Sequence, residues 1–181
     1  TELDRNRRGD FPLSLNSDYD SERYAGYGQW TPQLSDQVQA TLGARFETFS
    51  DDYNDSDLTR SDSSDDLWSL DAGLRLDLTN NSNLFVLASR GNKAGGVNTD
   101  ASTNIGAIDP TFRGELQDRL RFQSESLTNV ELGVNTTTLQ DRMQIKASLF
   151  YNKRNNPQFE TFLYDNISSF LFVGYQDNAD S

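Results

Sequence analysis

The segment Val38-Gln-Ala-Thr-Leu-Gly-Ala-Arg-Phe-Glu-Thr48 has the clearest pattern in the chain. Apolar side chains occupy every second position from Val38 to Phe46, and mostly polar or small residues stand between them. Because successive side chains of a β-strand point to opposite faces, this pattern predicts a strand with one apolar and one polar face. The segment Leu67–Leu78 repeats the pattern and places Asp71 and Arg75 on its polar face. Burying such charges in a dry core is costly, so we expect the polar face to be hydrated.

Further segments with strand character complete an antiparallel meander. Segment 83–91 is apolar at both odd and even positions, so the sequence does not show which of its side chains face which side. Segment 141–164 is counted as one strand with a bend at Pro157, because proline cannot donate to a strand ladder. The predicted fold class is all-β, with about seven strands and no helix. The strands are expected near residues 23–33, 37–49, 67–79, 83–91, 127–136, 141–164 and 170–178. We expect one curved sheet whose convex face carries Val38, Leu42, Leu70, Leu74, Leu132 and Ile145.

The connections between these strands alternate between short and long. The short ones are rich in Ser, Asp, Asn and Thr, which are turn residues. Outer-membrane barrels have short periplasmic turns at one end and long extracellular loops at the other, whereas soluble sandwiches usually have long connections at both ends. The pattern therefore indicates part of a transmembrane barrel wall. The short connections are Leu34–Gln37, Thr79–Ser82 and Thr136–Asp141, and the long ones are Ser50–Asp66, Gly91–Ser126 and a stretch around Asp165–Ser169.

Aromatic residues stand mainly where the predicted strands meet the long connections. Trp30 is the exception, because it lies beside a short one. Aromatic girdles at the two membrane interfaces have this arrangement, although strand ends of any β protein are rich in aromatics. The residues at the long connections are Phe46, Phe49, Trp68, Phe150 and Tyr151.

Composition excludes several classes of function. The chain has 16 basic and 28 acidic residues and a net charge of −12, which argues against a nucleic-acid partner. It contains no Cys and no His, so the commonest general base and transition-metal ligand are missing. We expect no enzyme activity and no cofactor. A mean hydropathy of −0.73 suits a barrel wall, in which only every second strand residue faces lipid. Residues 1–10 show no signal peptide, so we expect it to have been removed or the chain to begin inside a longer one.

Several runs in the chain resemble those of one family. The run Leu84–Asn98, LFVLASRGNKAGGVN, resembles the ASYSRGYKAGGFN stretch of TonB-dependent receptor barrels, although Asn92 stands where an aromatic residue is usual. Other family-like runs occur in the same order as in those barrels, and together they span roughly residues 24–179. They are Tyr27–Trp30, Leu42–Arg45, Leu127–Asn135, Leu149–Tyr151 followed by Gln158, and Asn178-Ala179.

The resemblance implies a receptor with a barrel of about 22 strands and an N-terminal plug domain. Such receptors lie in the outer membrane of Gram-negative bacteria, in contact with lipid and lipopolysaccharide. They import scarce ligands, typically ferric siderophores and sometimes cobalamin, haem or glycans, with energy delivered by TonB through the plug. Nothing in this chain resembles the plug, so we expect an internal piece of such a barrel.

Three sets of residues are candidate sites or structural pairs. Arg90, Lys93 and Asn98 open the longest connection and could bind an anionic ligand, but the simpler interpretation is that the glycines beside them let the strand end and turn sharply. Asp52, Asp55 and Asp57 could bind Ca²⁺ or Mg²⁺, but the loop lacks the glycine of an EF-hand, and a solvated acidic loop is the simpler interpretation. Placing Phe49 opposite Leu67 pairs Arg45 with Asp71. Placing Val134 opposite Met143 pairs Glu131 with Lys146, and both pairs would face the lumen.

Two alternatives to the receptor remain open at this point. A small, complete barrel of the OmpA or OmpX type would suit the length of the chain. A soluble β-sandwich that binds a ligand would have to bury the charged second faces of its strands. Apolar residues of the predicted convex face buried between two sheets would contradict the membrane interpretation.

Overall fold

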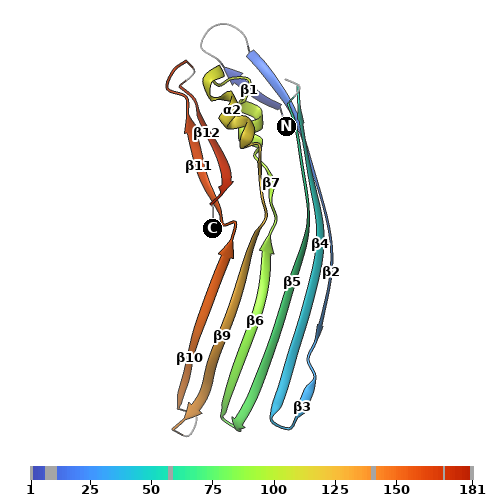
Figure 1. The fold of residues 1–181 in the computed structure, drawn as a ribbon, viewed down its shortest axis with the longest axis vertical. Helices are drawn as coiled ribbons and strands as arrows, with labels where there is room; N and C mark the ends of the chain where they lie inside the picture. Colours follow the sequence, from blue (N-terminus) through green and yellow to red (C-terminus); the bar gives the residue numbers. More distant parts are fainter. Residues whose placement is uncertain (1, 7–11, 57–58, 140–141, 169, 180–181) are drawn as a thin grey trace.

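The computed structural model describes residues 2–6, 12–56, 59–139, 142–168 and 170–179, with side chains from residue 16 onward. Most of these residues lie in antiparallel strands, and two short helices occur near one end (Figure 1). The strands are β1 (Glu2–Asn6), β2 (Pro12–Trp30), β3 (Gln33–Ser35), β4 (Val38–Asp55), β5 (Arg60–Thr79), β6 (Ser82–Lys93), β7 (Gly96–Val97), β8 (Arg121–Phe122), β9 (Glu125–Thr138), β10 (Met143–Asn155), β11 (Gln158–Tyr164) and β12 (Phe172–Asn178). The helices are α1 (Thr99–Asn104) and α2 (Pro110–Asp118).

Eight of the strands form one antiparallel sheet, which we call the wall. Its order is β1-β2-β4-β5-β6-β9-β10, and β3 pairs with β4 beside β2. The pairs β7–β8 and β11–β12 form two small separate sheets. This is the predicted meander, and the wall is an open sheet (Figure 1). The tight turns that follow β3 and β5 lie at the end of the wall where β9 ends and β10 begins, and the helices lie at the other end, as the alternation of short and long connections predicted (Figure 1).

Strand pairing places all six predicted apolar residues on the same side of the wall. Val38 lies opposite Leu76, Leu42 opposite Ala72, Leu74 opposite Val86 and Val86 opposite Leu132. Leu132 in turn lies opposite Leu149, which shares its side of β10 with Ile145. We call this side the outer face and the opposite side the inner face. The outer face carries Val38, Leu42, Leu70, Leu74, Leu132 and Ile145.

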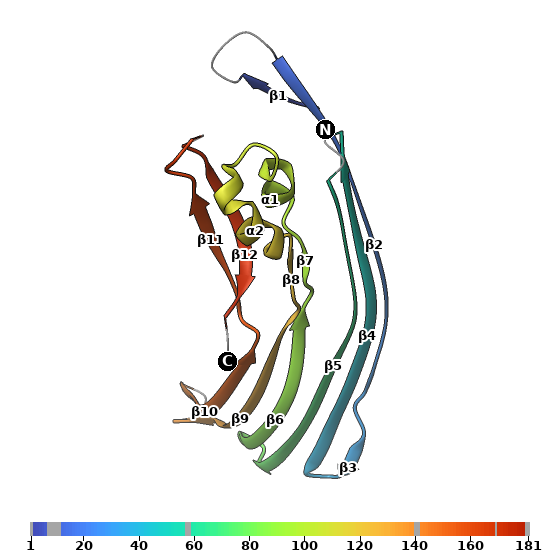
Figure 2. The same cartoon turned by 45° about the horizontal axis from the view of Figure 1, so that its top comes forward.

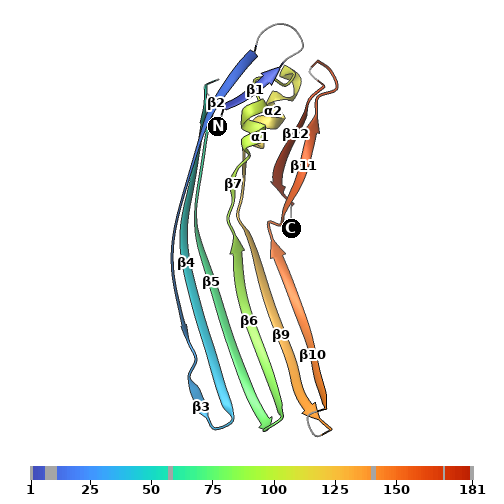
Figure 3. The same ribbon diagram turned by 180° about the vertical axis from the view of Figure 1, so that it is seen from behind.

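The large apolar side chains of the outer face are exposed. Leu42, Leu70, Leu74 and Leu132 are each 47–56% exposed, so no second sheet covers them among the described residues. The wall curves around the helices, so the inner face is the concave one (Figures 2 and 3). A continuous exposed apolar face of this extent marks a surface that contacts a partner or a membrane. The sandwich alternative, which requires these residues to be buried, is therefore wrong.

The pairing also shows the facing of segment 83–91, which its sequence left open. Leu84, Val86, Ala88 and Arg90 share the outer face with Leu70 and Leu74. Phe85, Leu87 and Ser89 share the inner face. Phe85 lies opposite Gly133, and any side chain at Gly133 would overlap the Phe85 ring. The glycine thus leaves room for an aromatic ring to lie flat on the polar inner face, which explains the apolar residues at both parities of β6.

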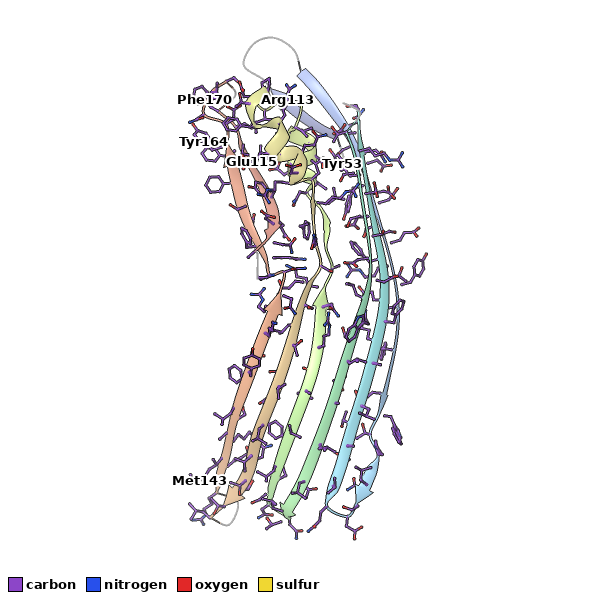
Figure 4. The ribbon with its side chains drawn as sticks, in the orientation of Figure 1. Tyr53, Arg113, Glu115, Met143, Tyr164 and Phe170 are labelled. Carbon is purple, nitrogen blue, oxygen red and sulfur yellow. The ribbon has the colours of Figure 1, made fainter. Side chains whose placement is uncertain are left out.

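Three strands reach further than predicted. β2 begins at Pro12 rather than near residue 23, and β4 and β5 continue through most of the expected Ser50–Asp66 loop. The missed residues are mainly Ser, Asp and Asn, which favour turns when considered singly. In the structure these residues lengthen the β4–β5 hairpin beyond the apolar part of the wall. Their backbone groups pair in the strand ladder, although the side chains on both faces there are mostly polar. Tyr53 is almost fully buried there, on the side that faces the helices (Figure 4).

The predicted strand 141–164 is divided at its bend. β10 ends at Asn155, Asn156 has a positive φ of 48°, and β11 starts after Pro157. β11 pairs with β12 instead of continuing the ladder with β9. The position of the bend was predicted correctly, but the two halves belong to different sheets.

The longest connection contains both helices, whereas the sequence reading expected no helix. Asp109 caps α2 by accepting a hydrogen bond from the Thr111 amide at 2.9 Å, and Pro110 follows at the first helical position. This Asp-Pro pair is a helix-start signal that was available in the sequence. The helices and the β11–β12 hairpin share a small core, and we call these four elements the cap. The core contains Ala101, Ile108, Leu116, Leu163, Val173 and Tyr175.

Both predicted lumen pairs are wrong in register. Arg45 lies opposite Ser69, and Asp71 lies opposite Gly43. Lys146 lies opposite Asn135, and Glu131 opposite Phe150. The strands meet at tighter turns than assumed, which shifts each pairing along the ladder. The missing side chain of Gly43 leaves space that the Asp71 carboxylate occupies.

Candidate functional site

The inner face carries a polar cavity of about 640 Å³ where the wall meets β7 and β8. β2 and β4 contribute most of its charged side chains, since alternate residues of both strands face inward, and β6 contributes Lys93. The backbone from Lys93 to Val97 closes the opposite side. Among its lining residues are Arg23, Arg45, Glu47, Phe49, Asp51 and Lys93.

Glu47 is the central charge of this cavity. It is buried, and it forms an ion pair with Arg45 on its own strand and another with Arg23 on β2 at 3.4 Å. The Arg23 guanidinium also lies over the Phe49 ring, 5.4 Å from its centre. Both arginine side chains remain about half exposed to the cavity side or the solvent. Glu47 therefore holds the two arginines at the inner face, and their guanidinium groups keep N–H donors available.

Asp51 lies deeper in the same cavity. It is 5% exposed, and its Oδ1 atom is buried without a hydrogen-bond partner. Burial raises the pKa of the Tyr19 hydroxyl, and the hydrogen bond and negative charge of Asp51 raise it further. Tyr19 is thus a neutral donor to Asp51 at physiological pH. A carboxylate with an unused buried oxygen is prepared for one more donor.

The predicted ligand residues Arg90, Lys93 and Asn98 do not come together. Lys93 lines the inner cavity, but Arg90 lies on the outer face opposite Leu70. Asn98 is buried at the residue that precedes α1. The sequence analysis missed Arg23, Glu47 and Asp51. The inward parity of Glu47 was visible, but its pairing with Arg23 depended on the register of β2 against β4, which was not predicted.

Asn98 connects three segments through its side chain. Its Nδ2 donates to the carbonyls of Arg119 at 2.8 Å and of Gln176 at 2.7 Å. Its Oδ1 accepts from the Gln176 amide at 2.8 Å. The backbone amide of Asn98 also donates to Leu120 O. This residue is therefore a structural link between the start of α1, the end of α2 and β12.

Two other residues from the family-like runs have the same kind of role. Gln158 Nε2 donates to Ala94 O at 2.8 Å and to Gln123 O at 2.9 Å. Asn178 Nδ2 donates to Asn156 O and Gln123 O, and its Oδ1 accepts from the Gln123 amide. Asn98, Gln158 and Asn178, which all belong to the family-like runs, thus hold backbone segments in place.

Glu125 secures the corner between β10 and β11. It accepts hydrogen bonds from Arg154 Nε at 2.6 Å and from the Gln158 amide at 2.9 Å. Burial alone would raise the pKa of Glu125, but these bonds and the charges of Arg154 and Lys93 outweigh it and lower the pKa. Glu125 stays ionised at neutral pH and fixes the strand that leads into the cap.

The predicted metal ligands do not form a site among the described residues. Asp52 and Asp55 lie at opposite parities of β4, so they face opposite sides. Asp55 accepts hydrogen bonds from the Thr59 amide at 2.8 Å and from Tyr53 Oη at 3.1 Å. Asp57 lies outside the described residues. No group of three or more acidic residues in the described part of the chain is arranged to hold a metal ion.

Comparison with known proteins identifies the family of this fold. Residues 3–179 match the family described as TonB dependent receptor-like, beta-barrel. The chain therefore belongs to the TonB-dependent receptor family, whose members are outer-membrane receptors and transporters rather than enzymes. No curated protein matches the chain. No helix in the described residues is long and apolar enough to cross a membrane.

Solved structures show the same fold. The ferric yersiniabactin uptake receptor of Yersinia pestis is similar with a TM-score of 0.58 and 23% identity, over 80% of this chain and 22% of that receptor. The ferric-catecholate import receptor of E. coli K12 has a TM-score of 0.59 and 16% identity, over 93% and 25%. The alcaligin outer-membrane receptor of Bordetella pertussis has a TM-score of 0.54 and 11% identity, over 88% and 26%. The chain spans about a quarter of the length of these receptors.

Proposed function

We propose that this chain forms part of the barrel wall of an outer-membrane receptor that imports a scarce ligand, with a ferric siderophore as the best-supported class. The outer face contacts lipid and lipopolysaccharide, and the inner face contacts the ligand and the plug. The segment itself contributes binding and not chemistry. Energy from TonB would arrive through the plug domain of the receptor.

The observation that carries this proposal is the charge of the inner cavity. The chain as a whole has a net charge of −12, yet Arg23, Arg45 and Lys93 face two carboxylates in the cavity. Three cations against Glu47 and Asp51 leave the cavity with an excess of positive charge. Many ferric chelates are anionic, and a partly enclosed cationic surface attracts them by focusing the field. The similar solved receptors are named for ferric yersiniabactin, ferric catecholates and alcaligin, which supports the ligand class.

The same arrangement favours a receptor over a small complete barrel. A barrel of eight strands has an interior just wide enough for its own side chains to fill. Here the cap and the cavity both lie on the concave side of an open wall (Figure 2). Enclosing them requires a barrel of wider circumference.

The proposal predicts that Lys93→Ala impairs uptake. Lys93 lines the cavity and has no ion pair within normal contact distance among the described residues. We expect the apparent KM for uptake of a radioactive ferric complex to rise roughly tenfold, the equivalent of one lost charged contact. Uptake would be measured in cells that produce the complete receptor in their outer membrane, with ferric catecholate and ferric hydroxamate complexes as probes. Cyanocobalamin would serve as a probe without iron.

Lys146→Ala is the matched control for this prediction. Lys146 is an exposed inner-face lysine near the short turns, far along the wall from the cavity. We expect it to leave uptake unchanged. If Lys93→Ala and Lys146→Ala transport every probe as well as the unmodified receptor, the inner cavity is not the ligand surface. Uptake of cyanocobalamin alone would overturn the iron class but leave the receptor proposal intact.

A further inference from the structure

Arg90 is a cation on the face of the wall that we assign to lipid. It shares the outer face with Val86 and Ala88 and lies opposite Leu70 on β5. Its guanidinium lies over the Trp68 ring, 4.3 Å from the ring centre. Its Nε atom is shielded from solvent and has no hydrogen-bond partner. None of the ion pairs of the described residues involves Arg90, so its charge has no counterion among them.

Arg90 stands at the end of an apolar groove on the outer face. The groove has a volume of about 830 Å³. Two pairs of small residues form its floor: Gly28 lies opposite Ala44, and Ala72 lies opposite Ala88. Leu70 lies opposite Ala44, and Leu42 lies opposite Ala72. Larger side chains rise around them, namely Trp30, Leu42, Trp68 and Leu70. Thr128 lies directly opposite Arg90 and adds a hydroxyl group at the same end.

The end of the groove at Arg90 lies at the level of the extracellular membrane–water interface. From Thr79, beside a short turn, β5 rises to Trp68 over roughly 36 Å, since each residue adds about 3.3 Å. With a strand tilt of roughly 40° this is about 28 Å of height, close to the roughly 25 Å of an outer-membrane apolar band. The long connections mark this end as extracellular. Arg90 therefore meets the headgroup region of the outer leaflet, and the groove extends from it into the hydrocarbon.

We propose that this groove binds one phosphorylated glycolipid of the outer leaflet, the lipid A part of lipopolysaccharide. One acyl chain lies over the floor of small residues, and a phosphate accepts hydrogen bonds from Arg90 and Thr128. A guanidinium held flat on an indole has its donors prearranged, and its fork matches phosphate geometry. The inference rests on the proposed function only in assigning the outer face to lipid, and it names a specific lipid at a specific place on that face.

Native mass spectrometry of the complete receptor, extracted from outer membranes in mild detergent, tests the proposal. We expect lipid A to remain bound to the unmodified receptor and to be lost from Arg90→Gln, with at least a tenfold fall in occupancy. Ala88→Phe fills the groove without changing its charge and should also displace the lipid. Arg75→Gln is the control, because Arg75 lies on the inner face and pairs with Asp77 at 2.8 Å. Heat-modified mobility in gels would establish that each variant is folded.

Competition with added lipids identifies the ligand. Dephosphorylated lipid A and phosphatidylglycerol should both bind at least tenfold more weakly than lipid A. Equal binding of dephosphorylated lipid A would overturn the role of the phosphate, and equal binding of phosphatidylglycerol would overturn the choice of glycolipid. Unchanged occupancy in Arg90→Gln would overturn the site itself. Uptake of ferric complexes through Arg90→Gln is a separate readout, so failure here is distinguishable from failure of the proposed transport function.

Discussion

Asn98→Ala is expected to unlock the cap while leaving the wall folded. The substitution removes both donors of the Asn98 amide and its acceptor, and it leaves Arg119 O, Gln176 O and the Gln176 amide without these partners. Each buried group left unpaired costs about 1–3 kcal/mol. We therefore expect the free energy that is needed to open the cap to fall by about 2–4 kcal/mol.

Hydrogen exchange measured by mass spectrometry would detect this change. Amides of α1, α2 and β12 should exchange faster in Asn98→Ala, and amides of β4, β5 and β9 should keep their protection. Asn98→Asp retains the acceptor for the Gln176 amide but no donors, so we expect an intermediate or equal loss. Asn166→Ala is the control, because Asn166 is exposed in the loop that joins β11 and β12. Unchanged exchange in α1 and β12 of the Asn98→Ala variant would show that Asn98 does not hold the cap.

Leu74→Arg is expected to have the largest effect on the wall. Leu74 lies near the middle of the Trp68–Thr79 part of β5 that we assign to the membrane, on the outer face, opposite Ala40 on one side and Val86 on the other. Arginine or lysine at the lipid face near the bilayer midplane costs about 2–4 kcal/mol. We expect this loss in the free energy of unfolding, measured by urea titration of the complete receptor in lipid vesicles.

Thr41→Arg provides the matched comparison for Leu74→Arg. Thr41 lies on β4 at nearly the same height but on the inner face, opposite Gly73. The inner face is polar and hydrated, so the same added side chain should cost well under about 1 kcal/mol there. Equal destabilisation by the two substitutions would mean that the two faces of the wall meet similar surroundings, and the membrane assignment would fail.

The alternation of side chains was sufficient to predict the two faces of the wall. Leu42, Leu70 and Leu132 share the outer face because a two-residue period survives any even change of register. The register itself was not predictable in the same way. Turn residues such as Asp51 and Asp52 continue a strand here, because pairing with β2 and β5 satisfies their backbone groups. Because the loop was assumed to begin after Phe49, the predicted partners of β4 on β5 were shifted along the ladder.

The candidate site was harder to predict than the wall, for the same reason. Arg90 and Lys93 are close in sequence, but they differ in parity, so the wall separates them onto opposite faces. Arg23 and Lys93 are distant in sequence, and only the order of the strands brings them to one cavity. Asn98 was predicted as a ligand residue because it lies, with Arg90 and Lys93, where the longest connection opens. Its actual partners, Arg119 and Gln176, depend on the helices of the cap, which the sequence reading did not include.

Spin labels placed along one strand test the central claim most directly. This chain contains no cysteine, so single cysteines can be placed in β5 and labelled one at a time, with any cysteine elsewhere in the complete receptor replaced by serine. The positions are Ser69, Leu70, Asp71, Ala72, Gly73 and Leu74. In the complete receptor embedded in outer-membrane lipid, collision rates with oxygen and with a water-soluble nickel complex would be measured for each label. We predict that labels at Leu70, Ala72 and Leu74 are accessible to oxygen and shielded from nickel, and that labels at Ser69, Asp71 and Gly73 show the reverse. Accessibility to nickel at all six positions, with no two-residue alternation, would contradict the assignment of this chain as the wall of a membrane barrel.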